Sequence, residues 1–195
     1  MAARPTFVFA HGAGAPSSSG WMVAWREWLA TLGDVVAFDY PYMRAGRKAP
    51  DKLPALIAAH RAVLAEARAR AAGPLFLIGK SMGGRVGCHV ALEEPVAGVI
   101  CLGYPLQSGA TGVMRDEVLL ALRTPILFVQ GTRDALCPLD KLAAVRARMT
   151  APSTLLAVEG GDHSLAVSAA QRKASGATQS DSDARVLDAI KAFVS

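Results

Sequence analysis

Ser81 is the residue of this sequence best placed to act as a nucleophile. It lies in residues 75–84, LFLIGKSMGG, where four apolar residues predict a short buried strand and GKSMG follows at once. Residues 85–92 then suit a helix. A strand, G-x-S-x-G and a helix form the pattern of a nucleophile elbow, a turn so tight that its flanking Gly79 and Gly83 can carry no side chains. Because G-x-S-x-G also fits a plain strand-to-helix turn, the other chemical groups decide between the two.

Two further residues complete a set of nucleophile, acid and base in the chain order Ser81, Asp134, His163. A serine hydroxyl is a poor nucleophile unless a base removes its proton, and a neutral His163 can take that proton and later return it to the leaving group. Asp134 would orient the imidazole ring and stabilise its charged form. Each residue follows a predicted strand, and the carboxyl ends of parallel strands meet at one edge of a sheet. The sequence therefore predicts a serine triad.

The negative charge that develops on a carbonyl oxygen during such a reaction needs hydrogen-bond donors. We expect one from the Met82 N–H, at the start of the helix after Ser81, and one from Ala13 or Gly14 in the glycine-rich loop after the first strand. The chain is too short for a large cap domain, so the substrate pocket should be shallow and formed by loops. Its predicted lining residues are Tyr42, Met43, Leu106 and Leu136.

Other polar residues at strand ends compete for these roles. Asp39 ends an earlier strand and is more typical of a residue that hydrogen-bonds the loop. Asp162 directly precedes His163, which is a poor geometry for orienting that ring. His11 is interpreted as packing and hydrogen-bonding under the oxyanion loop, not as a second base. Asp134 is therefore the expected acid.

Several reactive side chains have more than one interpretation. Lys80, just before the serine, could pair with an acid such as Asp39 or could favour an anionic substrate, and both remain open. Cys137 could be a reactive thiol near the site, although a small apolar filler is the preferred interpretation. His60 is expected at the surface or its boundary, and His89 is expected to be structural.

The rest of the sequence alternates strands with helices. Strands are predicted at residues 6–10, 34–38, 75–78, 96–103, 126–130 and 154–158, and helices at 20–32, 51–72, 85–92, 115–123, 138–149 and 183–194. The strands are continuous apolar runs, which is typical of a parallel sheet covered on both faces. We predict a single α/β domain over residues 1–195, with a mainly parallel sheet of about six strands in a three-layer sandwich. Asp51 and Asp183 should cap helices, and residues 168–183 should form a mobile polar loop.

Composition argues against several classes of protein. The hydrophobic fraction is 52%, yet no apolar run approaches the ~18 residues of a membrane helix, and the N-terminal apolar stretch is too short for a signal peptide. We therefore expect a cytoplasmic protein without a membrane partner. The net charge of +5 comes from scattered basic residues, which does not indicate nucleic-acid binding. Cys88, Cys101 and Cys137 are widely spaced, so neither a disulfide framework nor a metal site is predicted, and no cofactor is expected.

With these residues identified, the sequence resembles a particular group of α/β-hydrolases. They are related to testis-expressed protein 30 and to the third regulatory subunit of the non-specific-lethal histone acetyltransferase complex. The matching segments are HGAG at His11, FDYPYM at Phe38, GKSMGGR at Gly79, CLGYPL at Cys101, FVQGTRD at Phe128 and GDHS at Gly161. More distantly, the sequence is similar to dienelactone hydrolase and to small acyl-thioesterases. The resemblance implies an α/β-hydrolase fold and the Ser81–Asp134–His163 triad, but implies little about the substrate.

Two classes of function follow from these observations. The first is a serine hydrolase that cleaves a small-molecule carboxylic ester or thioester through an acyl-enzyme. The second is a catalytically silent, hydrolase-like module for binding or complex assembly, because some eukaryotic members of the resembled group act as parts of larger complexes. The complete triad favours the first class.

Overall fold

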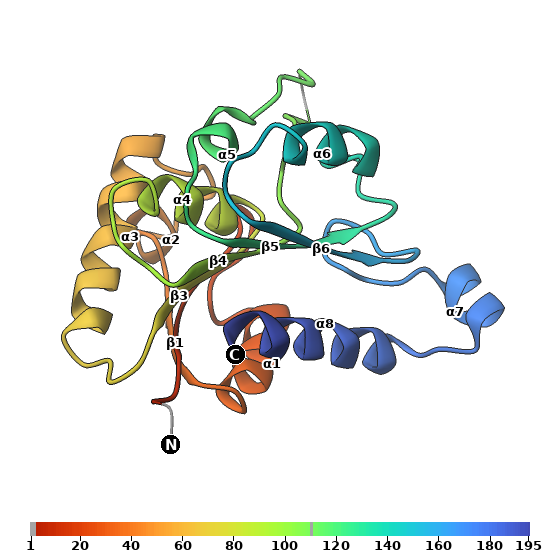
Figure 1. The fold of residues 1–195 in the computed structure, drawn as a ribbon, viewed down its shortest axis with the longest axis horizontal. Coiled ribbons are helices and arrows are strands. Elements are labelled where there is room, and N and C mark those ends of the chain that lie inside the picture. The colour runs from red at the N-terminus through yellow and green to blue at the C-terminus, as the bar shows by residue number, and fades with distance from the viewer. Residues whose placement is uncertain (1–2, 110) are drawn as a thin grey trace.

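A six-stranded sheet forms the centre of the computed structural model, which describes residues 3–109 and 111–195 (Figure 1). The strands are β1 (Thr6–Ala10), β2 (Asp34–Phe38), β3 (Leu75–Lys80), β4 (Gly98–Leu102), β5 (Ile126–Gly131) and β6 (Ser153–Val158). Their order in the sheet is β2-β1-β3-β4-β5-β6, and neighbouring strands run parallel throughout. The predicted parallel α/β architecture is confirmed.

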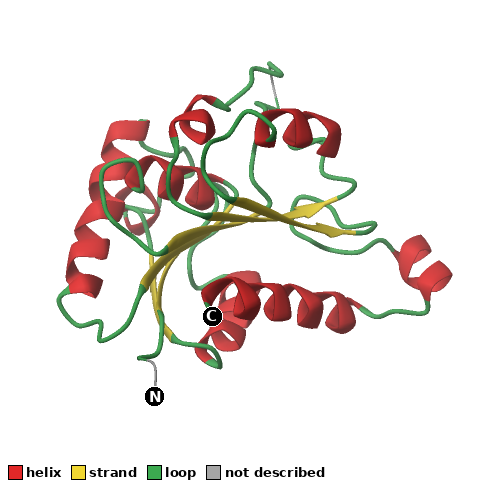
Figure 2. Cartoon of the chain, viewed as in Figure 1, coloured by secondary structure: helices red, strands yellow, loops and turns green. Residues whose placement is uncertain are grey.

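Helices cover both faces of this sheet (Figures 1 and 2). One face carries α1 (Gly20–Ala30) and α8 (Gln179–Val194), and the other carries α3 (Leu53–Arg68), α4 (Met82–Val90), α5 (Glu117–Ala121) and α6 (Leu139–Arg146). Two short helices, α2 (Pro41–Arg44) and α7 (Ala169–Ser175), lie in the connections after β2 and β6. None of the helices that the structure describes is long and apolar enough to cross a membrane.

Apolar side chains of the strands pack against the helices on both faces of the sheet and so form two hydrophobic layers. In β3, Phe76 and Ile78 pack into the cluster with α1 and α8, whereas Leu77 between them packs with α3 and α4. Side chains of a strand alternate between its faces, so a strand buried on both faces needs no polar positions. Each such buried side chain stabilises the fold by about 1.5–3 kcal/mol.

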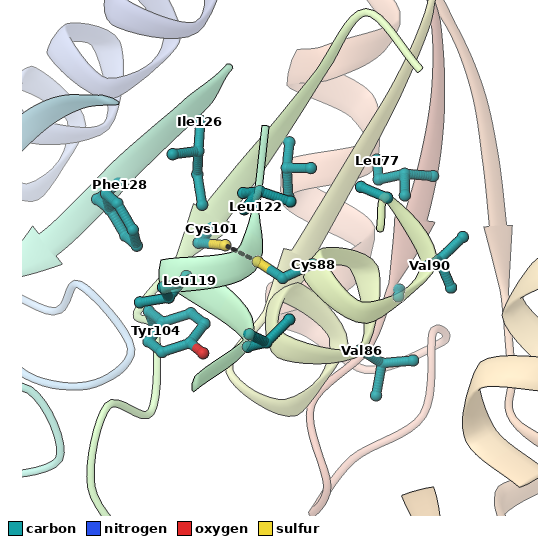
Figure 3. Packing of buried hydrophobic residues seen from close by; sticks show 14 of the residues in the cluster. Leu77, Val86, Cys88, Val90, Cys101, Tyr104, Leu119, Leu122, Ile126 and Phe128 are labelled. Carbon is teal, nitrogen blue, oxygen red and sulfur yellow. Dashed lines mark hydrogen bonds between the residues drawn. The ribbon is translucent and has the colours of Figure 1, made fainter. Parts of the chain in front are cut away.

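Two of the three thiols meet inside one of these layers (Figure 3). Cys88 of α4 and Cys101 of β4 place their Sγ atoms 3.8 Å apart among apolar side chains. Burial raises the pKa of the Cys101 thiol, and it raises the pKa of Cys137 to about 12. A protonated, buried thiol is unreactive and packs as a small apolar group, as preferred for Cys137.

The polar segment 168–183 is not the predicted loop, because its polar residues cap two helices. Ser168 accepts a hydrogen bond from a backbone N–H of α7. Thr178 and Asp181 form a capping box at the start of α8, so this helix begins before Asp183, the predicted cap. The predicted cap of α3 is also wrong. Asp51 instead pairs with Arg47 at 2.6 Å, and α3 begins at Leu53.

His60 is fully buried, and its predicted place at the surface boundary is wrong. It lies four residues from both Leu56 and Leu64, on the face of α3 that packs against the sheet. Its Nδ1 atom is 3.1 Å from the Tyr40 hydroxyl, and its ring lies 5.1 Å from that of Phe38. Burial lowers the pKa of His60 to about 3.

We expect this histidine to make folding stability depend on pH. An unfolded histidine has a pKa of about 6.5, so between about pH 6.5 and pH 3 the unfolded chain binds a proton that folded His60 does not accept. Stability should be complete above this window and should decline as the pH falls through it, by about 2 kcal/mol at pH 5. The free energy of urea unfolding should fall between pH 7.5 and pH 5. This fall should be about 2 kcal/mol smaller in His60→Gln than in the unmodified protein. An equal loss of unfolding free energy in the two proteins would contradict a lowered pKa of His60 as its cause.

Candidate active site

The Ser81 turn has the strained geometry of a nucleophile elbow. Ser81 stands between β3 and α4 with φ 49° and ψ −115°, a conformation that non-glycine residues rarely adopt. A Cβ atom on Gly79 would lie 2.3 Å from the carbonyl carbon of Gly83, and one on Gly83 would lie 2.5 Å from the oxygen of Ala10. Both glycines are therefore required by close backbone contact. The Ser81 N–H donates to Leu102 O at 3.0 Å, which ties the turn to β4.

Ser81, His163 and Asp134 lie in one line of hydrogen bonds. His163 Nε2 is 2.8 Å from Ser81 Oγ, and His163 Nδ1 is 2.7 Å from Asp134 Oδ2. The carboxylate can only accept, so the imidazole carries its proton on Nδ1 and leaves Nε2 to accept from the serine hydroxyl. Asp134 is 4% exposed, whereas the His163 side chain is 28% exposed. The structure thus brings His163 into contact with Ser81, 82 positions away in the sequence, and with Asp134, 29 positions away.

Gln130 fixes the carboxylate of Asp134, a role that the sequence pattern alone does not indicate. Its Nε2 donates to Asp134 Oδ2 at 2.5 Å, while its Oε1 accepts the N–H of Tyr104 at 2.9 Å. The Leu136 N–H donates to the other carboxylate oxygen at 2.8 Å. The available signal was a lone polar side chain in the buried strand ILFVQG, four residues before the acid.

The two competing aspartates accept hydrogen bonds from loop backbone and not from His163, as predicted. Asp39 Oδ1 accepts the N–H of Ser17 at 2.6 Å. Asp162 Oδ1 accepts the N–H groups of Ser164 and Ala166 at 2.7 and 3.0 Å. The Asp162 bonds hold the turn after β6, the Asp39 bond holds the loop after β1, and the orientation of the His163 ring is left to Asp134.

The loop after β1 is held beside Ser81 by buried polar groups. His11 Nε2 accepts the N–H of Tyr40 at 3.1 Å, so its proton is on Nδ1, which donates to Gly12 O at 2.6 Å. Burial lowers the pKa of His11, which keeps the ring neutral. The Tyr42 hydroxyl donates to Ala13 O at 3.0 Å. His11 therefore packs under this loop, as the sequence indicated.

Met82, Ala13 and Gly14, the candidates for the two expected oxyanion donors, lie around the serine. Met82 is the first residue of α4, and Ala13 and Gly14 line the cavity on which Ser81 opens. In the part of the chain that the structure describes, the backbone N–H groups of these three residues donate to no protein acceptor. A helix N-terminus also carries a partial positive charge, which favours an anion at Met82.

The cavity beside Ser81 has a volume of about 440 Å³ and extends toward α1. Its lining comprises Gly12, Ala13, Gly14, Ala15, Ser19, Trp21, Met22, Lys80, Ser81, His163 and Ser164. The four predicted lining residues lie elsewhere. Tyr42 and Leu106 are fully buried, and Met43 and Leu136 are half-buried. Trp21 faces the cavity, whereas Trp25 of the same helix is buried in the hydrophobic core, and nothing in the sequence distinguishes the two.

Lys80 extends into this cavity and does not pair with Asp39. Its Nζ atom donates to Ser164 Oγ at 2.9 Å and to His163 O at 3.4 Å, and it lies 4.8 Å from the centre of the Trp21 ring. Burial lowers the pKa of the Lys80 ammonium. Across residues 3–109 and 111–195, no group of three His, Cys, Asp or Glu side chains is arranged to hold a metal ion.

A parallel sheet with a serine elbow at the carboxyl end of a central strand, and a histidine and an acid from later strands, defines an α/β-hydrolase. The family model described as "Alpha/beta hydrolase domain" matches residues 3–195, and the chain belongs to this family.

Solved structures of hydrolases share the fold. An alpha-beta serine hydrolase homologue from Coxiella burnetii matches with a TM-score of 0.69 and 21% identity, over 81% of this chain and 76% of its own. A structure of the metagenome-derived lipolytic enzymes LipS and LipT matches with a TM-score of 0.71 and 17% identity, over 99% and 94%. Est1E from Butyrivibrio proteoclasticus with bound ferulic acid matches with a TM-score of 0.70 and 18% identity, over 97% and 87%.

Proposed function

We propose that the protein is a serine hydrolase that cleaves a small carboxylic ester or thioester through Ser81, His163 and Asp134. The observation that carries this proposal is the pair of hydrogen bonds, 2.8 and 2.7 Å, that joins a strained elbow serine to a histidine and a buried carboxylate. His163 Nε2 takes the hydroxyl proton as Ser81 Oγ attacks the substrate carbonyl. Asp134 stabilises the imidazolium that forms.

The oxyanion of the tetrahedral intermediate would accept hydrogen bonds from the Met82 N–H and from Ala13 or Gly14. Removing one such donor typically costs about 10²–10³ in rate. When the intermediate collapses, His163 gives its proton to the departing alcohol or thiol and leaves an acyl group on Ser81. Water then attacks the acyl-enzyme, with His163 again as the base, and the carboxylic acid is released.

A small substrate is supported by the size of the cavity. Its volume of about 440 Å³ lies at the lower end of the range for small-molecule pockets, which is about 300–1,000 Å³. The similar structures support ester chemistry, because one is of lipolytic enzymes and another is of an enzyme with bound ferulic acid.

We also propose that the chain groups, within its family, with the relatives of testis-expressed protein 30 and of the histone acetyltransferase subunit. The segments that carry this resemblance contain the proposed site. GKSMGGR holds Ser81, FVQGTRD holds Gln130 and Asp134, and GDHS holds His163. The alternative, a silent binding module, is disfavoured because all three triad residues are present and in contact.

The test is a panel of p-nitrophenyl esters and matching thioesters of increasing acyl length. Because the cavity is small, we expect turnover of short acyl chains and a decline for long ones. Heat-denatured protein at the same concentration measures the non-enzymatic background. If folded protein hydrolyses no ester or thioester above that background, the silent binding module becomes the better account.

A further inference from the structure

Lys80 brings an unpaired positive charge into the proposed substrate cavity. None of the ion pairs within 4.0 Å among the described residues involves it, and its hydrogen bonds go to the neutral oxygens of Ser164 and His163. Asp134 and Asp162 are the acids whose charges act on it. Both already accept bonds from other groups, Asp134 from His163 and Asp162 from backbone N–H groups.

A largely buried ammonium without an ion pair is costly, because burial removes water that solvates the charge. Burial is also the main reason that the pKa of Lys80 is lowered. A hydrophobic residue at this position would pack against Trp21 and Gly12 without that cost. The two neutral oxygens and the Trp21 ring compensate part of this cost, but the described residues provide no anionic partner for the charge.

The position of the ammonium indicates where that partner would bind. Lys80 is bonded directly to Ser81, and its Nζ atom contacts the residue that follows His163. Both Lys80 and Ser81 line the same cavity, together with the apolar side chains of Trp21 and Met22. A substrate with its carbonyl group at Ser81 could thus extend a short apolar chain along this wall and end near Lys80.

We propose that Lys80 binds an anionic group of the substrate, so that the preferred substrate is an ester or thioester with a carboxylate a few bonds from the scissile carbonyl. This inference rests on the proposed function, because it concerns the same cavity and the same reaction. Charge-assisted contacts in a partly buried site are roughly twice as strong as neutral ones. We expect the anionic substrate to be preferred at least about tenfold.

The test compares ethyl hydrogen succinate with ethyl succinamate, its neutral amide of nearly the same shape. In the unmodified protein, kcat/KM should be at least about tenfold higher for the anionic ester. In Lys80→Met this ratio should fall to about 1. Lys173→Met, at an exposed position of α7, is the matched control and should keep the original ratio. Equal kcat/KM for both esters in the unmodified protein would overturn the proposal.

A binding measurement separates this inference from the proposed reaction. Ser81→Ala cannot form an acyl-enzyme, so calorimetric titration with each ester reports binding alone. We expect the anionic ester to bind at least about tenfold more tightly, and the preference to disappear in Ser81→Ala with Lys80→Met. Equal binding, or Lys80→Met slowing both esters by one factor, would make Lys80 a support for the His163 loop and not a substrate contact. If Ser81→Ala prefers the anionic ester but the unmodified protein hydrolyses neither ester, Lys80 remains an anion-binding residue and the proposed function is rejected.

Discussion

Ser81→Ala should reduce ester turnover by about 10⁵–10⁶-fold, the loss typical of removing a triad nucleophile. The variant lacks the oxygen that forms the acyl-enzyme, while the glycines that permit the elbow remain in place. Alanine at this position adopts the same strained backbone as serine and adds no atoms. We therefore expect circular dichroism and urea unfolding to match those of the unmodified protein closely.

The measurement is kcat on the best substrate of the ester panel. Ser175→Ala is a suitable control, because it removes a serine hydroxyl from the exposed helix α7, outside the cavity. Turnover by Ser81→Ala within tenfold of the unmodified protein would place the nucleophile elsewhere.

Asp134→Asn should lower kcat by at least about 10²-fold and up to about 10⁴-fold. The carboxylate now accepts from His163 Nδ1, Gln130 Nε2 and the Leu136 N–H. The amide has one acceptor oxygen and introduces N–H donors where these donors already point. The imidazole then favours the tautomer that cannot take the serine proton.

The control variants are Asp39→Asn and Asp162→Asn, because both aspartates bond to loop backbone instead of to His163. Each should cost less than about tenfold, a far smaller loss than is expected at Asp134. Circular dichroism checks that all three variants fold. A nearly normal Asp134→Asn beside an inactive Asp39→Asn or Asp162→Asn would mean that the triad is misassigned.

The parallel sheet and the hydrogen-bonded set of Ser81, His163 and Asp134 could be predicted because both depend on local sequence patterns. Continuous apolar runs indicate strands buried on both faces, and parallel strands bring their carboxyl ends to one edge. Ser81, Asp134 and His163 each follow such a run, so their proximity needs no detailed knowledge of packing. The tight turn at Gly79 and Gly83 is likewise a local requirement.

Other features depend on side-chain contacts between distant elements. The direction of the cavity toward α1 places Trp21 and Lys80 in its wall, whereas the loop residues favoured by the sequence lie elsewhere. Gln130 is held in place for its bond to Asp134 by the N–H of Tyr104, which comes from a different part of the chain. The polar residue type of His60 favours the surface, whereas its register with Leu56 and Leu64 puts it on the buried face of α3.

We propose that Ser81 is an activated nucleophile, and reaction with a fluorophosphonate probe can test this. The probe forms a covalent bond with a serine oxygen that an adjacent base has activated. Intact-mass spectrometry should show one adduct per chain, and peptide mapping should place it on Ser81. The adduct should be absent from Ser81→Ala and should form slowly in Asp134→Asn, which keeps the elbow and the oxyanion donors. Folded protein that takes up no probe, or an adduct that persists in Ser81→Ala, would contradict the account.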